Sequence, residues 1–331
     1  MDVLHPDQVL LGAQAGGASI SVCDHYCGVE ARIRKSLQLQ AEMTQEFGAC
    51  VFDVTLDCED GAPAGGEAEH ALMVADLLLS APPGARVATR VHPIDHPSFE
   101  ADVDVIVGKA GLRLCHVMLP KAESAADVER AAKALDAAGA PALPLHALIE
   151  SPQAVHNAFG IAAHPRVQSL SFGLMDFVST HGGAIPVDAM SLRGQFSHPL
   201  VLRAKLEIAS ACHAHGKTPS HSVITEFNDV QGVREAARRA NVEFGFTRMW
   251  SIHPSQIRPI IEAMAPAEAE IERASRVIVA ALNAQWAPAS VDGRLHDRAS
   301  YRYFWQLLKR ARNAGRALPG PVASLMLAPP Q

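Results

Sequence analysis

Acidic side chains directly follow one apolar run of this sequence. If the run is a strand, they lie at its carboxyl end, where a parallel α/β fold has its active site. Asp57, Glu59 and Asp60 come at the end of the run 50–56. Three acids so close together repel one another, so at least one is expected to pair with a base or to share a cation. The structural alternative is a solvated turn that caps the next helix, but such a turn does not need three acids.

Basic side chains follow the next two runs. Arg90 lies near the end of the run 86–92, and an arginine inside a protein is costly unless it meets an anion. That anion could be a substrate carboxylate or, as a structural partner, Glu59 or Asp60. Lys121 ends a Leu-Pro-Lys tripeptide and could pair with a catalytic acid, form a Schiff base, or be an ordinary surface lysine.

Two further acids, Glu150 and Asp176, follow two consecutive runs and predict a metal site. Neighbouring parallel strands lie about 4.8 Å apart, so acids at their ends can converge on one ion. Two carboxylates with no His or Cys beside them suit Mg²⁺, or Mn²⁺, better than zinc. Gly173 would let a substrate approach the backbone closely. The alternative is that both acids cap helices, Asp176 more readily than Glu150.

Histidine and cysteine give weaker signals. His25, in the tripeptide Asp-His-Tyr after the first apolar run, could lie at the mouth of the site and touch the substrate. Cys23 and Cys27 lack the second cysteine pair that a zinc site needs, so no metal is expected there.

The elements that must position these residues alternate along the chain. Apolar runs without clear alternation are typical of parallel strands covered on both faces, and helical patterns separate them. About eight such runs predict an α/β fold, specifically a TIM (β/α)8 barrel with a C-terminal helical extension. An open doubly wound sheet is less favoured, because no glycine-rich turn follows the first run. The runs are 20–23, 50–56, 86–92, 114–119, 145–149, 168–172, 219–224 and 246–252.

The sequence divides into a catalytic barrel over residues 1–265 and an extension over 266–331. In the extension, 287–296 is expected to be a loop and 299–314 a helix with an aromatic stripe. The stripe should dock either on its own barrel or on a neighbouring subunit. The proline-rich end, from 317, should be loosely ordered.

Composition excludes several classes of protein. The 331 residues are 48% hydrophobic, with 29 Lys and Arg against 35 Asp and Glu, a formal charge of −6. This charge balance does not require a strongly basic surface, so nucleic acid is a poor candidate partner. No apolar run approaches the roughly 20 residues that span a bilayer, and no secretory signal is visible. With six scattered cysteines, a reduced cytoplasmic protein is expected.

Taken in order, these motifs resemble the citrate lyase β-subunit-like family of the HpcH/HpaI aldolase superfamily. The series is the acidic strand end, the strand arginine, Leu-Pro-Lys, Ile-Glu, Phe-Gly-x-x-Asp and Ile-His-Pro-Ser-Gln. The resemblance implies a TIM barrel with a C-terminal extension, in trimers or hexamers. It also implies a Mg²⁺-dependent lyase that cleaves or forms a carbon–carbon bond in 3-hydroxy acids. The substrates would be CoA thioesters such as malyl-, citramalyl- or citryl-CoA.

The resemblance also implies roles for residues of the barrel. Glu150 and Asp176 would be the Mg²⁺ ligands. Arg90 would clamp the carboxylate of the oxo acid. Glu59 and Asp60 would support that arginine and the water shell of the metal.

Two more roles and several departures complete the comparison with the family. Lys121 matches its strand-end lysine, and Asp297 matches an acid that related malyl-CoA lyases bring from a neighbouring subunit to transfer a proton. The sequence departs from the family at three places. Residues 20–26 stand where the family has an Arg-Ser start, and His221 stands where many members have an aspartate after the seventh strand. Arg248 and Met249 replace a Gly-Lys pair.

Three other functions stay open from the sequence. The first is a class II pyruvate aldolase on free hydroxy-oxo acids, and the second is a non-catalytic paralogue that kept the fold. The third is a Schiff-base aldolase that uses Lys121.

Overall fold

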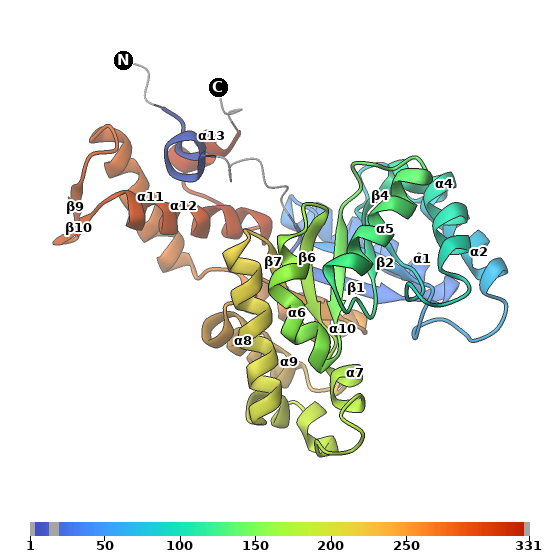
Figure 1. Ribbon diagram of the computed structural model, residues 1–331. Helices are drawn as coiled ribbons and strands as arrows, with labels where there is room; N and C mark the ends of the chain where they lie inside the picture. Colours follow the sequence, from blue (N-terminus) through green and yellow to red (C-terminus); the bar gives the residue numbers. More distant parts are fainter. Residues whose placement is uncertain (1–3, 13–19, 328–331) are drawn as a thin grey trace. The chain divides into compact units, whose positions relative to one another are not determined.

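The computed structural model describes residues 4–12 and 20–327, which form two compact units (Figure 1). We call residues 21–46 and 50–264 the barrel unit, and the rest the C-terminal unit. The expected division put all of 1–265 in the barrel. The described residues before Ser21 instead belong to the C-terminal unit.

Eight parallel strands close into a barrel in chain order, and the predicted TIM barrel is confirmed. Each strand pairs with its neighbours along the chain, and β8 returns to pair with β1. The strands are β1 (Cys23–Cys27), β2 (Phe52–Asp57), β3 (Val87–Arg90), β4 (Leu114–Leu119), β5 (Leu145–Ile149), β6 (Val167–Phe172), β7 (Thr218–His221) and β8 (Arg248–Ser251).

The first strand corrects the expected one. It does not run over 20–23 but over Cys23–Cys27, so Asp24, His25 and Tyr26 lie within the strand and not after it. An apolar run does not identify this strand, because Asp24 within it is a buried charge whose partner, Arg248, lies on β8. Since successive side chains of a strand point to opposite faces, His25 faces away from Asp24 and Tyr26.

Helices follow the strands on the outside of the barrel (Figure 1). Ser124 accepts a hydrogen bond from the backbone of Asp127 and caps α5, as its position predicts. Gly216 follows α8 with a φ of 64°, as expected of a residue that ends a helix. The helices of this unit are α1 (Glu30–Phe47), α2 (Glu67–Ser80), α3 (Phe99–Asp102), α4 (Gly108–Ala110), α5 (Ala125–Ala137), α6 (Pro152–Ala163), α7 (Leu174–Ser179), α8 (Pro199–Ala214), α9 (Val230–Phe244) and α10 (Pro254–Met264).

The C-terminal unit contains more regular structure than expected. Its elements are α11 (Glu268–Asn283), β9 (Ala289–Val291), β10 (Arg294–His296), α12 (Arg298–Asn313) and α13 (Gly320–Leu327). The predicted loop is an antiparallel hairpin, and part of the predicted loose end is a helix. Asp292 and Gly293 join the two strands with φ of 50° and 71°, the positive values that a two-residue Asp-Gly hairpin turn uses.

The aromatic stripe of α12 is buried inside its own unit. Tyr301 and Trp305 belong to one apolar cluster with residues of α11 and of the turn Asp7–Leu11. The indole of Trp305 donates a hydrogen bond to Asp7 at 2.7 Å. This packing buries most of the stripe within the unit, and its docking on the barrel or on a neighbouring subunit stays a prediction.

In the part of the chain that the structure describes, every helix is too short or too polar to cross a bilayer.

Candidate active site

A cavity of about 180 Å³ lies where several strands of the barrel end. In a TIM barrel the carboxyl ends of the strands carry the active site. Five of the predicted site residues line this cavity together, and Tyr26 and Trp250 join them. The lining consists of Tyr26, Asp60, Arg90, Glu150, Phe172, Gly173, Leu174, Met175, Asp176, Val223 and Trp250.

Arg90 ends β3 and is held in place by two carboxylates. Its Nε and Nη2 donate hydrogen bonds to Asp57 at 2.6 and 2.5 Å, and its Nη1 lies 2.9 Å from Glu59. Burial alone would lower the pKa of Arg90, but Asp57 and Glu59 raise it well above its usual range. Asp57 takes two of the five N–H groups and Glu59 faces a third, so the guanidinium can still bind a further anion.

Asp57 is the partner that the sequence did not identify for Arg90. Glu59 was expected to support the arginine and does contact it, whereas Asp60 is exposed and lines the cavity without an ion pair to Arg90 among the described residues. The register of β2 on β3 sets Asp57 directly beside Arg90. Both residues end their strands, but the sequence alone does not give the register that sets them side by side.

Lys121 is tied to the same acidic strand end. Its Nζ lies 2.7 Å from Glu59, and its side chain is 40% exposed. Burial lowers the pKa of Lys121, but the hydrogen bond and charge of Glu59 outweigh it, so the pKa lies above its ordinary value. Lys121 therefore keeps its charge near neutral pH, which disfavours its use as a Schiff-base nucleophile.

Glu150 is a buried carboxylate that forms no ion pair within the described part of the chain. It follows β5 and is 4% exposed, and its Oε2 has no hydrogen-bond partner among the described residues. Burial and the charges of Glu59 and Asp176 together raise its pKa to about 8, although Arg90 and Lys121 oppose the shift. Such a carboxylate is costly unless it meets a cation or a proton.

Gly173 leaves room for the Glu150 side chain. A Cβ at this position would lie 2.4 Å from Cγ and 2.7 Å from Oε1 of Glu150. Asp176 is half-buried in the first turn of α7, three residues further on. Glycine is therefore needed here to leave space for the Glu150 side chain, and not only to let a substrate approach the backbone.

Glu150 and Asp176 fit a divalent cation. Both offer hard oxygen ligands, which Mg²⁺ prefers. Both line the same cavity, and the charge of Asp176 adds to the cost of a charged Glu150. The orphaned oxygen of Glu150 is the observation that favours a bound ion over a pair of helix caps.

His25 lies in a second, larger cavity. This cavity of about 650 Å³ is lined by residues of β1 and α1 and of the loops after β2, β7 and β8. His25 is 2% exposed and its Nδ1 lies 3.0 Å from Oγ of Ser251. Tyr26 and Asp60 line both cavities, so the two spaces meet at these side chains.

Asp297 lies in the C-terminal unit, where its carboxylate has a structural contact. It caps α12 by accepting hydrogen bonds from the backbone of Ala299 and Ser300 at 3.0 and 3.2 Å. The side chain is exposed. Its proposed catalytic role stays a prediction.

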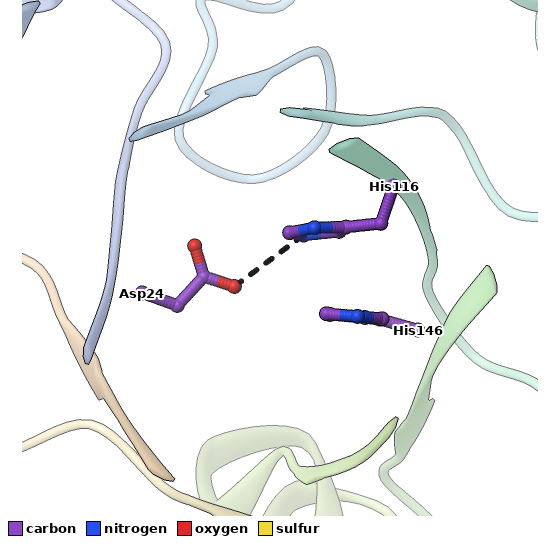
Figure 2. Close-up of side chains that lie close together, drawn as sticks. All are labelled: Asp24, His116 and His146. Carbon is purple, nitrogen blue, oxygen red and sulfur yellow. Dashed lines mark ion pairs between the residues drawn. The ribbon is translucent and has the colours of Figure 1, made fainter. Parts of the chain in front are cut away.

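A further charged cluster lies inside the barrel. Figure 2 shows Asp24, His116 and His146 pointing toward one another from β1, β4 and β5. The two imidazole rings are stacked with centroids 3.6 Å apart and planes 12° apart. A ring nitrogen binds a metal in the plane of its ring, so two parallel rings cannot share one ion. Asp24 is also already paired with Arg248 at 2.9 Å and with Thr55 at 2.6 Å. The cluster balances charge in the interior and does not fit a metal.

Comparison with known proteins places most of the barrel in one family. The model of the HpcH/HpaI aldolase/citrate lyase family matches residues 37–254. The chain is 46% identical to a citrate lyase from Burkholderia xenovorans LB400 whose crystal structure is known. That match covers 98% of this chain and 99% of the other, with a TM-score of 0.81.

Two further relatives carry more specific names. An L-malyl-CoA/beta-methylmalyl-CoA lyase of Cereibacter sphaeroides is 28% identical over 290 residues, which covers 81% of this chain and 90% of that protein. A citrate lyase beta subunit from M. tuberculosis, complexed with oxaloacetate and magnesium, is 27% identical with a TM-score of 0.58; the match covers 75% of this chain and 98% of that one. The resemblance seen in the order of the motifs is confirmed: the chain belongs to the HpcH/HpaI aldolase/citrate lyase family.

Proposed function

We propose that this protein is a Mg²⁺-dependent lyase that cleaves or forms a carbon–carbon bond in a 3-hydroxy acid carried as its CoA thioester. The observation that carries the proposal is one cavity in which Arg90 can take a carboxylate beside an unpaired Glu150. An oxo acid such as oxaloacetate, which the M. tuberculosis relative binds with magnesium, has the matching carboxylate and carbonyl oxygens.

The residues of the barrel would divide the work. Asp57 and Glu59 fix the plane of Arg90, whose remaining N–H groups bind the carboxylate of the substrate. Glu150 and Asp176 would hold the Mg²⁺. When bound there, the ion would supply a Lewis acid for the hydroxyl and carboxylate oxygens of the substrate. Mn²⁺ has the same ligand preference and is the alternative ion.

The larger cavity fits the remainder of a thioester. It meets the smaller cavity at Tyr26 and Asp60, so an acyl chain can pass from one into the other. Arg32 and Lys35, exposed on α1, line it and could bind the phosphates of CoA. Free hydroxy-oxo acids would leave this cavity empty, which favours the lyase over the pyruvate aldolase.

We also propose that the protein works as a homo-oligomer, a trimer or hexamer, in which Asp297 of a neighbouring copy transfers the proton. Sedimentation would give the number of subunits. In mixed oligomers of Asp297→Ala and Glu150→Gln chains, activity should return if the two residues act in different copies. Activity that stays lost on mixing, in oligomers shown to exchange subunits, would contradict the role of Asp297.

A cytoplasmic location is proposed as well. All six cysteines are free thiols, as in proteins of reducing compartments. Cell fractionation with an antibody against the chain tests this.

Turnover on a panel of thioesters tests the function. Malyl-, methylmalyl-, citramalyl- and citryl-CoA and the corresponding free acids are assayed with Mg²⁺ and after EDTA, and release of the keto acid is followed. Metal-dependent cleavage of a thioester is expected. Cleavage of free acids alone would support the pyruvate aldolase, and trapping of Lys121 by borohydride would support a Schiff base. Inactivity on every substrate, with Mg²⁺ bound, would favour the non-catalytic paralogue.

A further inference from the structure

We propose that the hydroxyl of Tyr26 is a catalytic hydrogen-bond donor, which stabilises the negative charge on the thioester oxygen as the carbon–carbon bond breaks. The inference rests on the proposed lyase function and adds a residue to the site that the motifs of the sequence did not assign. Three observations support it: the place of Tyr26 between the cavities, the contacts that fix its ring, and a hydroxyl without a hydrogen-bond partner among the described residues.

The place of Tyr26 corresponds to the reacting part of the substrate. The smaller cavity holds Arg90 and Glu150, which would bind the oxo-acid half, and the larger one would hold the CoA arm. The bond that breaks and the thioester carbonyl lie between these two halves. Tyr26 lines both cavities, so a substrate that occupies both must pass beside its side chain.

Two contacts hold the ring of Tyr26. The guanidinium carbon of Arg90 lies 5.0 Å from the ring centroid, within the range of a cation–π interaction. The indole of Trp250 meets it edge to face, with centroids 4.9 Å apart and planes 69° apart. Because Arg90 is itself fixed by Asp57, the phenol is positioned before the substrate binds, as a donor to a transition state must be.

The hydroxyl is available and protonated. No residue in the described part of the chain hydrogen bonds it, and the side chain is only half-buried. Burial raises the pKa of Tyr26 above its ordinary value; Arg90 opposes this, and the carboxylates of Asp57 and Glu150 add to it. The raised pKa means that the hydroxyl keeps its proton near neutral pH.

The step requires no oxidant or reductant. A base takes the proton of the substrate hydroxyl, and the oxygen forms the carbonyl of the oxo acid. The bond between that carbon and the α-carbon of the acyl group breaks, and its electron pair moves onto the thioester as an enolate. Tyr26 donates a hydrogen bond to the enolate oxygen and keeps its proton. The α-carbon then takes a proton from an acid of the site, and the products are the oxo acid and the acyl-CoA.

The variant Tyr26→Phe tests the proposal, since it keeps the ring on Arg90 and Trp250 and removes only the hydroxyl. Removing one donor of this kind costs about 10²- to 10³-fold in kcat. We therefore expect kcat on the active thioester to fall by about 10²-fold, while the melting temperature and the calorimetric Kd of oxaloacetate with Mg²⁺ stay unchanged. Tyr303→Phe, at a side chain 61% exposed in the C-terminal unit, is the matched control and should keep full activity.

The possible outcomes separate the two proposals. An active wild type with an equally active Tyr26→Phe variant overturns the role of Tyr26 and leaves the lyase function. A loss confined to oxaloacetate affinity, with kcat unchanged, also overturns it, because the hydroxyl would then bind the ground state. A wild type without activity on any thioester overturns the lyase function and this inference with it. Fluorinated tyrosines at position 26, which donate more strongly, should change kcat in a graded way only if the hydroxyl acts in the reaction.

Discussion

Asp57 and Arg90 lie side by side at the ends of β2 and β3, and the carboxylate accepts two hydrogen bonds from the guanidinium, at 2.6 and 2.5 Å. Both side chains are buried, 0% and 5% exposed. A two-pronged contact of this kind fixes the plane of the guanidinium as well as its place. The orientation of the proposed carboxylate clamp is thus set by its neighbour on the next strand.

Breaking this pair should affect both stability and binding. Asp57→Asn leaves a buried arginine without its main partner, and a broken buried pair costs about 3–5 kcal/mol. We expect that loss in urea unfolding, together with weaker binding of oxaloacetate by calorimetry. Asp76→Asn, at an exposed position of α2, is the control and should change neither. Wild-type stability in Asp57→Asn would show that Glu59 alone holds Arg90.

Gly173 should be intolerant of a methyl group. In Gly173→Ala the new Cβ would lie 2.4 Å from Cγ of Glu150, so that carboxylate must move. We expect Mg²⁺ binding to weaken by about tenfold or more, which corresponds to about 1.4 kcal/mol. The matched variant is Gly160→Ala, where nothing lies within 4 Å of the new Cβ in α6. It should keep its affinity for Mg²⁺ and gain up to about 1 kcal/mol of stability.

Glu150 should be needed for metal binding itself. Changing a residue around a metal ligand typically costs about 10- to 100-fold in affinity, so replacing a ligand should cost more. In calorimetry, Glu150→Gln is expected to show no measurable Mg²⁺ binding and no turnover. Glu42→Gln, exposed on α1, serves as the control. Full activity in Glu150→Gln would refute the assignment of the metal site.

His25 should make the protein sensitive to acid. Burial lowers the pKa of His25 to about 4, against about 6.5 in an unfolded chain. A lowered histidine pKa means that the unfolded chain binds the proton first, so its contribution is complete above pH 6.5 and is lost as the pH falls toward 4. The shift corresponds to roughly 3 kcal/mol. Unfolding free energies between pH 7 and 4 should therefore fall less steeply in His25→Gln than in the wild type.

The control for this measurement is His215→Gln, at an exposed position after α8. It should follow the wild type across the same range of pH. The same slope in His25→Gln as in the wild type would mean that other buried histidines, such as His146 and His221, carry the acid sensitivity.

The sequence by itself determined the barrel and most of the places where its chemistry lies. Covered parallel strands must be apolar on both faces, so β4 and β5 were predicted at their observed bounds, Leu114–Leu119 and Leu145–Ile149. Charged residues that follow such strands stand out by contrast, which is why Arg90, Lys121 and Glu150 could be named from the sequence.

Only the tertiary structure decided which of these residues meet. A shift of one residue turns every side chain of a strand to the other face. The extent of β1 therefore decided that Tyr26, and not His25, lines the smaller cavity. The choice of Asp57 over Asp60 as the partner of Arg90 depended likewise on the register of β2 against β3. Registers follow from contacts between segments far apart in the chain, and no local pattern of residues encodes them.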